Sequence, residues 1–403
     1  MDMAKPIIRF KGYQDDWEQR KLGDLTEELS EYATMASGLP LLTSSRSGLM
    51  YQSDFRDRKT TTSDETLFSI VPKGSCTYRH MSDDDIFHLN INVLEKGLVS
   101  REYPVFISSE NNDLEFIIQH INSSDRFRAF CKGQKKGGTR TRLYYKTLCE
   151  FEMMIPSIEE QKKISATLHS LDYLITLHQR KCDETKRLKK YMLQKMFPQN
   201  GEKVPEIRFS GFTDDWEQRK LEDIAEFSKG SGYSKGDLIE SGTPIILYGR
   251  LYTKYETSIS EVDTYVEAKD GSVYSKGGEV IVPASGETAE DIARAATVDK
   301  SGVILGGDLN VVSPNEDINS AFLAISISHG NSQRELAKKA QGKSVVHIHN
   351  EEIKNLVVPF SANAEQNKIV EYFSNLDHLI TLHQRELENL QNIKKFMLGK
   401  MFV

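Results

Sequence analysis

Residues 8–25 read IRFKGYQDDWEQRKLGDL and residues 207–224 read IRFSGFTDDWEQRKLEDI, so one segment stands twice in the chain. A second pair closes each half: EEQKKISATLHSLDYLITLHQRKCDETKRLKKYMLQKMF ends at Phe197, and AEQNKIVEYFSNLDHLITLHQRELENLQNIKKFMLGKMF ends at Phe402. The blocks between these constant segments, about residues 26–154 and 225–357, share almost no identity. This internal repeat predicts two units built on one plan, each with a variable block of its own.

The two closing segments have the pattern of long helices, because apolar residues recur at alternating spacings of four and three. Such a narrow stripe is best buried against another helix of the same kind, which predicts a coiled coil. Two copies in one chain can mimic a two-fold dimer, so we expect them to pack antiparallel as rigid spacers roughly 55 Å long. The stripe positions are Ile164, Leu168, Leu171, Ile175, Met192, Met196, Ile369, Phe373, Leu376, Ile380, Met397 and Met401.

The variable blocks mix short β-type runs with helical patterns, which predicts two α+β domains. In the first block we expect strands at residues 67–71, 103–108 and 151–156, and a helix at 111–132. In the second block we expect strands at 243–249, 278–284 and 302–307, and helices at 319–330 and 331–342. The predicted domains are residues 1–154 and 199–357, and the predicted constant helices are 155–198 and 358–403.

Composition restricts the class of protein. No run approaches the about 20 apolar residues of a membrane helix, and the first residues lack a signal peptide, so we expect a cytoplasmic protein. Four cysteines stand far apart, which predicts neither a disulfide framework nor a zinc site. The net charge of −7 argues mildly against nucleic-acid binding by the whole chain, but a local basic surface is compatible with an acidic total.

Catalytic signatures are weak throughout the sequence. The tripeptide at 342–344 resembles the end of a phosphate-binding loop, but Ala337 stands where that loop requires glycine. His347 and His349 alternate as on a strand and share one face; with no other ligand type nearby, this pattern favours a polar surface over a metal site. We therefore expect no covalent chemistry and no metal in this chain.

Basic clusters give the strongest indication of a ligand. Residues 126–146 contain eight Lys and Arg, no acid and interleaved aromatic residues, and residues 248–255 and 334–344 form similar clusters in the second block. Such stretches can neutralise phosphates, or they can be solvated basic faces. Both blocks place a Gly- and Lys-rich stretch shortly before the strand that leads into the constant helix. The candidate DNA contacts from these clusters are Lys135, Lys136, Arg140, Arg142, Tyr248, Arg250, Tyr252, Lys254, Lys338, Lys339, Gln341, Lys343 and Ser344.

The whole arrangement resembles the specificity subunit of type I restriction-modification systems. The resemblance rests on WEQRKL at 17–22 and 216–221 and on EQxKI at 160–164 and 365–369. The second block adds Gly-Thr-Pro-Ile at 242–245, Gly-Glu-Val at 278–280 and Ser-Gly-Glu at 285–287, which are similar to common target-recognition domains. In the first block, Val-Ser-Arg at 99–101 and Gly-Thr-Arg at 138–140 resemble a different class of such domain. These motifs add Arg101 and Ser285 to the candidate DNA contacts.

The resemblance implies a non-catalytic subunit. Each variable block would read one half of a bipartite, asymmetric site in double-stranded DNA, and the paired helices would set the number of unread base pairs. Two methyltransferase subunits, which bind S-adenosylmethionine and methylate adenine N6, would dock on the helical stripe. Two ATP-driven translocase-nuclease subunits would join them, so S-adenosylmethionine, ATP and magnesium would belong to the partners and no cofactor to this chain.

Two other interpretations remain open from the sequence. The acidic total and the long heptad helices are compatible with an interaction scaffold that has no role in DNA binding. An enzyme with an unfamiliar active site is the third interpretation, which the absence of a phosphate loop, metal cluster or nucleophile motif disfavours.

Overall fold

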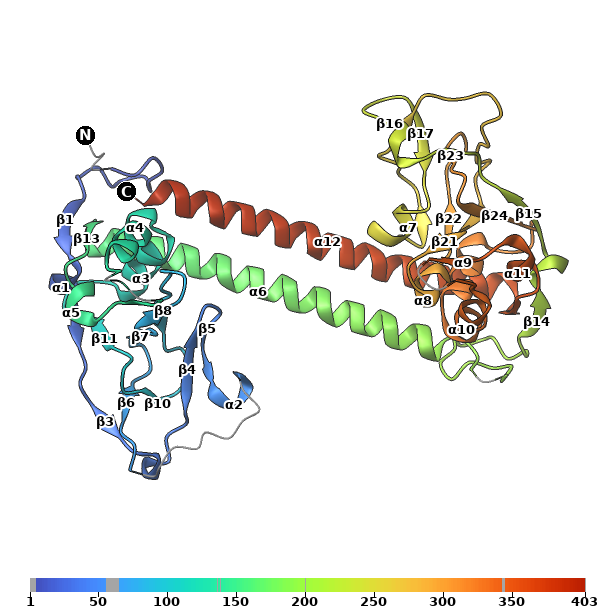
Figure 1. The fold of residues 1–403 in the computed structure, drawn as a ribbon. Coiled ribbons are helices and arrows are strands. Elements are labelled where there is room, and N and C mark those ends of the chain that lie inside the picture. Colours follow the sequence, from blue (N-terminus) through green and yellow to red (C-terminus); the bar gives the residue numbers. More distant parts are fainter. Residues whose placement is uncertain are drawn as a thin grey trace. The chain divides into compact units, whose positions relative to one another are not determined.

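The computed structural model describes residues 5–55, 65–135, 137, 139–199, 201–342 and 345–402. The candidate contacts Lys136, Lys343 and Ser344, together with Gly138, lie outside the described residues. The chain divides into two compact units: unit 1 comprises residues 1–179 and 385–403, and unit 2 comprises residues 180–384. Each unit therefore contains one variable block and a part of both long helices, α6 (Ile158–Lys195) and α12 (Asn363–Met401) (Figure 1).

The centre of unit 1 is a four-stranded antiparallel sheet with the strand order β2-β11-β7-β9. Phe106 of this sheet is fully buried and belongs to the same apolar core as Phe116 and Phe127 of the following helices. Burial of these rings attaches the helices to the sheet, because apolar burial is the main favourable term in folding. The strands are β2 (Thr26–Glu28), β7 (Cys76–Thr77), β9 (Asn90–Ile91) and β11 (Val105–Ser108).

The helix predicted at 111–132 is wrong in one respect, because the structure has two helices there. They are α3 (Leu114–Ser123) and α4 (Asp125–Gly133). Ser124 between them has an extended backbone, and its Oγ accepts a hydrogen bond from the N–H of Phe127. A serine that caps the second helix in this way ends the first, since the capping residue leaves the helical conformation.

The rest of unit 1 contains a second sheet, β10-β6-β3, and the hairpin β4-β5, which lie at the end of the unit away from α3 and α4 (Figure 1). The strands predicted at 67–71 and 103–108 are confirmed as β6 and β11. The remaining elements are α1 (Leu22–Leu25), β3 (Tyr32–Ala33), η1 (Met35–Ser37), β4 (Leu42–Ser45), β5 (Gly48–Tyr51), α2 (Gln52–Phe55), β6 (Phe68–Val71), β8 (Met81–Ser82), β10 (Gly97–Ser100), β12 (Thr141–Arg142) and α5 (Tyr145–Leu148).

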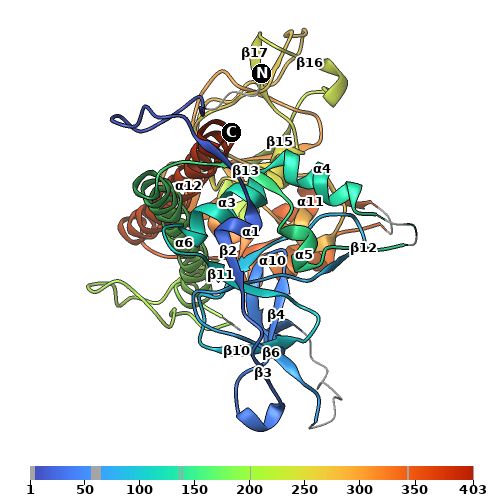
Figure 2. The same cartoon turned by 90° about the vertical axis from the view of Figure 1, so that its left-hand side faces the viewer.

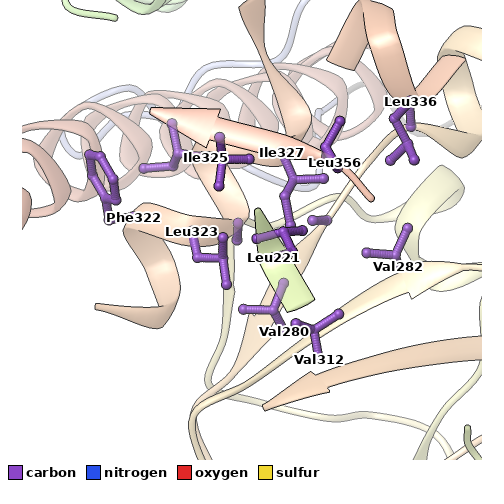
Figure 3. Close-up of a cluster of buried hydrophobic side chains, with 14 of the residues drawn as sticks. Leu221, Val280, Val282, Val312, Phe322, Leu323, Ile325, Ile327, Leu336 and Leu356 are labelled. Atoms are coloured by element: carbon purple, nitrogen blue, oxygen red, sulfur yellow. The ribbon is translucent and has the colours of Figure 1, made fainter. Parts of the chain in front are cut away.

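The centre of unit 2 is a five-stranded sheet with the order β15-β24-β20-β22-β18, antiparallel except for the pair β18 and β22. Figure 3 shows its core, in which Val280 and Val312 of the sheet lie near Leu323 of α9. The helices predicted at 319–330 and 331–342 are confirmed as α9 (Ser320–Ser328) and α10 (Gly330–Lys339). The strands are β15 (Ala225–Lys229), β18 (Ser258–Ile259), β20 (Glu279–Pro283), β22 (Ala296–Val298) and β24 (Leu309–Pro314).

Unit 2 also has a smaller sheet, β16-β19-β17-β23, at the end away from α9, α10 and α11 (Figure 1). The strands predicted at 243–249, 278–284 and 302–307 are confirmed as β17, β20 and the short β23. The remaining elements are η2 (Leu221–Asp223), η3 (Lys235–Asp237), β16 (Leu238–Ile239), β17 (Thr243–Ile246), α7 (Arg250–Thr253), β19 (Tyr265–Val266), β21 (Ser285–Gly286), α8 (Ala289–Ile292), β23 (Ile304–Leu305), β25 (Val346–His347) and α11 (Asn350–Lys354).

The opening constant segments form the same contact in both units. In unit 1, β1 (Glu18–Lys21) pairs antiparallel with β13 (Glu152–Ile155), which confirms the strand predicted at 151–156. In unit 2, β14 (Glu217–Lys220) pairs in the same register with β26 (Val357–Phe360). Each opening segment is therefore joined to the strand that enters the closing helix.

The two long helices run antiparallel where they meet within each unit. In unit 1, Leu168 of α6 and Met401 of α12 lie in one core, and an ion pair joins Asp172 to Lys394. In unit 2, Lys189 of α6 pairs with Asp377 of α12 at 2.6 Å. The rings of Phe197 and Phe373 lie 6.4 Å apart there. The side-by-side helices agree with the prediction, whereas knob-into-hole packing of a coiled coil stays a prediction.

The observed class is α+β, with two mixed units that share two long helices, as the repeat predicted. All four cysteines are free thiols. Among the described residues, no helix combines the length and the apolar character needed to cross a membrane.

Candidate nucleic-acid interface

Each unit has a pair of very short strands, of which the first directly follows a strand of the central sheet along the chain. In unit 1, β8 pairs with β12, and Arg142 lies opposite Met81. In unit 2, β21 pairs with β25, and His347 lies opposite Ser285. We name residues 81–82 with 140–144 strand pair 1, and residues 285–286 with 345–349 strand pair 2.

Strand pair 1 presents alternate side chains to solvent. Arg140, Arg142 and Tyr144 are exposed, whereas Thr141 and Leu143 between them are buried. This follows from the two-residue period of an extended chain. Along the chain, β12 follows α4 and precedes α5 (Figure 2). The exposed row therefore lies next to the basic loop that the sequence singled out.

Tyr144 is held by a buried partner. Its ring is 51% exposed on one side and stacks on His80 at a centroid distance of 5.6 Å. Burial lowers the pKa of His80, so this imidazole is neutral at physiological pH. A neutral, buried ring under an exposed tyrosine gives a fixed aromatic surface in the row.

The predicted cations of unit 1 meet around strand pair 1, but they are not equally available. Arg140 donates from Nε to Asp83 at 2.7 Å, and Lys135 lies 3.6 Å from Asp85. Arg142 forms no ion pair with any residue that the structure describes. A hollow of about 440 Å³ adjoins these side chains. It is lined by Gln134, Gly137, Thr139, Arg140, Arg142, Tyr144 and Thr147.

Arg101 lies just after β10, with its guanidinium 5.4 Å from the centre of the Tyr32 ring. The adjacent Ser100 lines a second hollow of about 610 Å³, which also reaches Ser82 of β8. Two exposed arginines that the sequence reasoning missed, Arg46 and Arg79, line this hollow. They were missed because each stands outside the basic clusters of the sequence.

Strand pair 2 repeats the alternation with different side chains. Val345, His347 and His349 are exposed, whereas Val346 and Ile348 are buried. The two imidazole rings lie parallel, with an interplanar angle of 9°. The expectation that these histidines share one face is therefore confirmed.

Three predicted contacts of unit 2 meet at strand pair 2. Ser285 Oγ and His347 Nδ1 share a hydrogen bond of 3.1 Å, and the hydroxyl of Tyr252 donates to the Ser285 carbonyl at 2.7 Å. Gln341 exchanges two backbone hydrogen bonds with His347. Gly342 has φ +134°, and a Cβ there would stand 1.9 Å from the Val345 carbonyl oxygen. Glycine is therefore required in the turn that leads into β25.

Lys338 and Lys339 lie in the last turn of α10, just before this turn. Lys338 is exposed and pairs with Glu335 at 2.7 Å. Lys339 donates weakly to the carbonyls of Glu352 and Asn355 at 3.4 and 3.3 Å. Exposed ion pairs are weak, so Lys338 can exchange its partner for a phosphate at low cost.

The cluster at 248–255 is a separate part of unit 2. The Arg250 side chain is only 8% exposed and pairs with Glu256 and Asp263, both at 2.7 Å. Lys254 also pairs with Asp263, at 2.9 Å. Tyr248 is partly exposed in a hollow of about 600 Å³ with Arg250 and Lys254. Arg250 therefore organises its own segment, and its contact with DNA stays a prediction.

Most residues of the predicted helical stripe are buried inside the units. Leu168 is 0%, Ile369 1%, Phe373 1% and Met401 2% exposed. Their apolar surfaces are used for packing within the chain. The exposed apolar residues on α6 and α12 are others, which the sequence reasoning missed: Tyr173, Leu174, Leu188, Tyr191, Leu379, Leu382, Ile393 and Phe396.

Three comparisons relate this chain to known proteins. The model of the type I restriction modification DNA specificity domain matches residues 86–187 and 213–392. The type I restriction enzyme MjaVIII specificity subunit of Methanocaldococcus jannaschii is 22% identical over 66% of this chain and 65% of its own length. The crystal structure of a type I restriction-modification S subunit from M. genitalium covers 99% of both chains, with a TM-score of 0.62 and 13% identity. The last similarity is one of fold.

Proposed function

Because the chain belongs to the type I restriction-modification DNA specificity family, we propose that it reads duplex DNA and does no covalent chemistry of its own. One observation supports this most strongly: two variable blocks of unlike sequence present equivalent strand pairs beside Gly- and Lys-rich loops. Each block would read one half of a bipartite, asymmetric site. We assign the reading domains to residues 1–154 and 199–357, and the connecting helices to 155–198 and 358–403.

The helices would also be the platform for partner subunits. In unit 1, Leu174 of α6 and the pair Ile393 and Phe396 of α12 are exposed close to the ion pair Asp172–Lys394. Clustered exposed apolar side chains mark interaction surfaces.

Unit 2 has an equivalent group of exposed apolar side chains on the long helices. Leu379 of α12 and the pair Leu188 and Tyr191 of α6 are exposed close to Lys189–Asp377. In the internal repeat Leu379 corresponds to Leu174, since the closing segments are offset by 205 residues. Two equivalent surfaces fit two copies of one partner, which we propose is the adenine-N6 methyltransferase subunit.

The remaining activities would belong to the assembled complex. Two ATP-dependent translocase-endonuclease subunits would join the methyltransferase subunits, and S-adenosylmethionine, ATP and magnesium would bind to these partners. This chain would select the sequence and hold no cofactor. We place the complex in the cytoplasm, where chromosomal and incoming DNA meet.

Methylation mapping tests the proposed function directly. The chain is co-expressed with the methyltransferase subunit of its own system, and N6-methyladenine is mapped across the host genome. We expect one two-part methylated motif with a fixed gap. Exchange of one variable block should change only one half of this motif. If the two proteins co-purify but no methylation is found, the scaffold role remains and DNA reading is rejected. If the two proteins do not associate, the assignment of the methyltransferase as partner is rejected as well.

The role of the helices as spacers has a test of its own. Four residues, about one helical turn, are inserted into each of α6 and α12 at equivalent positions of the repeat. We expect the unread gap of the methylated motif to lengthen while both halves stay the same. An unchanged gap would reject the spacer role.

An interaction scaffold without DNA binding is the second candidate, and the net charge of −7 favours it. It predicts that the chain and its methyltransferase together bind no duplex DNA above the level of the methyltransferase alone. Titration of a labelled duplex that carries the mapped motif separates the two candidates.

A further inference from the structure

The two strand pairs occupy the same place in the order of elements. The first strands, β8 and β21, directly follow β7 and β20, and the second strands, β12 and β25, lie between α4 and α5 and between α10 and α11. One backbone hydrogen bond also corresponds: Leu143 N–H donates to His80 O at 2.8 Å, and Ile348 N–H donates to Ala284 O at 3.1 Å. This equivalence could not be read from the sequences, which differ at every exposed position.

Residue equivalences follow from the register. Arg142 faces Met81 across strand pair 1, and His347 faces Ser285 across strand pair 2. Because Met81 and Ser285 each begin the first strand of their pair, Arg142 and His347 are equivalent. Two residues further on, Tyr144 and His349 are equivalent by the same register.

We propose that Arg142 and His347 are the equivalent specificity-determining residues of the two units, each reading a base edge in its own half-site. This inference rests on the proposed function and assigns that function to particular side chains. A two-stranded β-ribbon fits the major groove of B-DNA, where every base pair presents a distinct set of donors and acceptors. The exposed middle position of each row is then the one that meets the bases.

The geometry favours Arg142 over the other cations of unit 1. Lys135 and Arg140 each have an acidic neighbour, whereas Arg142 has no ion-pair partner among the described residues. A guanidinium with free donors can pair with O6 and N7 of guanine, and this is the commonest specific contact in DNA recognition. Unit 1 is therefore expected to read a guanine at this position.

His347 is oriented for base contact by a hydrogen bond within the chain. The hydrogen bond of its Nδ1 with Ser285 Oγ fixes the ring plane and leaves Nε2 for another partner. Ser285 is itself fixed by Tyr252, whose hydroxyl binds its carbonyl oxygen. The equivalent positions thus carry different chemistry on one backbone frame, which gives the two half-sites different sequences.

The test substitutes each residue in the full chain, co-expressed with its methyltransferase. In Arg142→Ala we expect discrimination at one base pair of one half-site to fall about 10- to 100-fold, since one good base contact contributes that much. In His347→Ala the loss appears in the other half-site. The unaffected half is the internal control of each variant, and Arg20→Ala, an exposed arginine on β1, is the matched control for Arg142.

A second variant separates reading from charge. Arg142→Lys keeps the positive charge but loses the two-pronged geometry, so we expect near-normal DNA affinity with relaxed choice of base. If the unsubstituted chain yields a two-part motif and both alanine variants retain it unchanged, the assignment of these residues is wrong while the proposed function stands. If the unsubstituted chain yields no two-part motif, both are wrong.

Discussion

The variable blocks of the two units have almost no sequence identity, yet four strands of their central sheets follow the same order. The order β2-β11-β7-β9 in unit 1 matches β15-β24-β20-β22 in unit 2. Each sheet is followed by two helices, a strand of the short pair, a short helix and the strand that enters a long helix. The two units thus share these elements as a common frame, and they differ in the fifth strand β18, in their smaller sheets, and in side chains and loops.

Constant residues contribute to this frame through backbone contacts. Gln161 accepts a hydrogen bond from the N–H of Asp113, which caps α3, and donates to the carbonyl of Pro156. Gln366 makes the same two contacts, with Asn319 N–H and Ser361 O. Because both contacts are to the backbone, they do not depend on the side chains of the variable block. A block can therefore change its surface without losing its attachment to the helix.

The largest effect is expected from the two buried ion pairs. Glu160 is paired with Arg9, and Glu365 with Arg208, both at 2.7 Å, and the carboxylates are 0% and 1% exposed. Glu160→Ala and Glu365→Ala each leave a largely buried guanidinium without its partner, which costs about 3–4 kcal/mol. Each should destabilise its own unit by a similar amount.

The two tryptophans allow this to be measured unit by unit. Trp17 is buried in unit 1 and Trp216 in unit 2, and the chain has no others. Urea unfolding is followed by fluorescence in a Trp216→Phe background for unit 1 and a Trp17→Phe background for unit 2. Lys21→Ala, which removes an exposed pair with Glu150, is the control and should leave the stability of unit 1 almost unchanged, because exposed ion pairs are weak. If one glutamate variant lowers the free energy of unfolding of both units equally, the two units are not independently stabilised by their ion pairs.

A second prediction concerns the phenylalanine at the end of each long helix. Phe197 packs on Trp216 and Phe322 in unit 2, and Phe402 packs on Phe116 in unit 1. Phe197 is 5% exposed, so Phe197→Ala should cost unit 2 about 3 kcal/mol. Phe402 is only partly buried, and its replacement should cost unit 1 about 2 kcal/mol. The same fluorescence titrations check both values, and the reverse order would contradict the comparison.

Sequence patterns predicted the frame well. The repeat, the long helices and the longer strands were found because apolar periodicity persists over several residues in each. The break at Ser124 was missed because local capping overrode a continuous helical pattern.

The candidate site was predicted only in part. The basic loops were found from their charge, and the alternation of His347 and His349 indicated a strand at β25, but β8, β12 and β21 have two residues each and carry no readable period. Arg250 was a candidate DNA contact, whereas in the structure its side chain is 8% exposed and pairs with Glu256 and Asp263, six and 13 residues further along the chain. Pairing of this kind depends on the fold of the chain around the residue, which composition does not reveal.

The third prediction uses a position where the units differ. Ser124 caps α4 with its side chain, whereas the equivalent His329 begins α10 without a side-chain cap. Burial, with help from Lys189 and Arg294, lowers the pKa of His329 to about 4. The unfolded chain then binds the proton more readily, so unit 2 loses stability as pH falls from about 6.5 toward 4.

His329→Ser should remove this loss and supply a cap. Between pH 7 and pH 5 we expect the parent chain to lose about 1–2 kcal/mol of stability that the variant keeps. Urea titrations at both pH values, followed through Trp216, measure the difference. An identical pH dependence in parent and variant would show that His329 does not titrate with unfolding.

The smallest effect is expected from the lysines beside the two strand pairs. Lys135 and Lys338 are held only by weak contacts, at 3.6 Å to Asp85 and in an exposed pair with Glu335. If each meets one phosphate, replacement by alanine should lower the slope of log affinity against log salt by about 0.9 and leave the methylated motif unchanged. Binding to the mapped duplex at several salt concentrations measures the slope. Equal changes in the slope for both lysines would mean that the two units contact DNA phosphates in equivalent ways. A change for one lysine alone would mean that the units share a fold but dock on DNA differently.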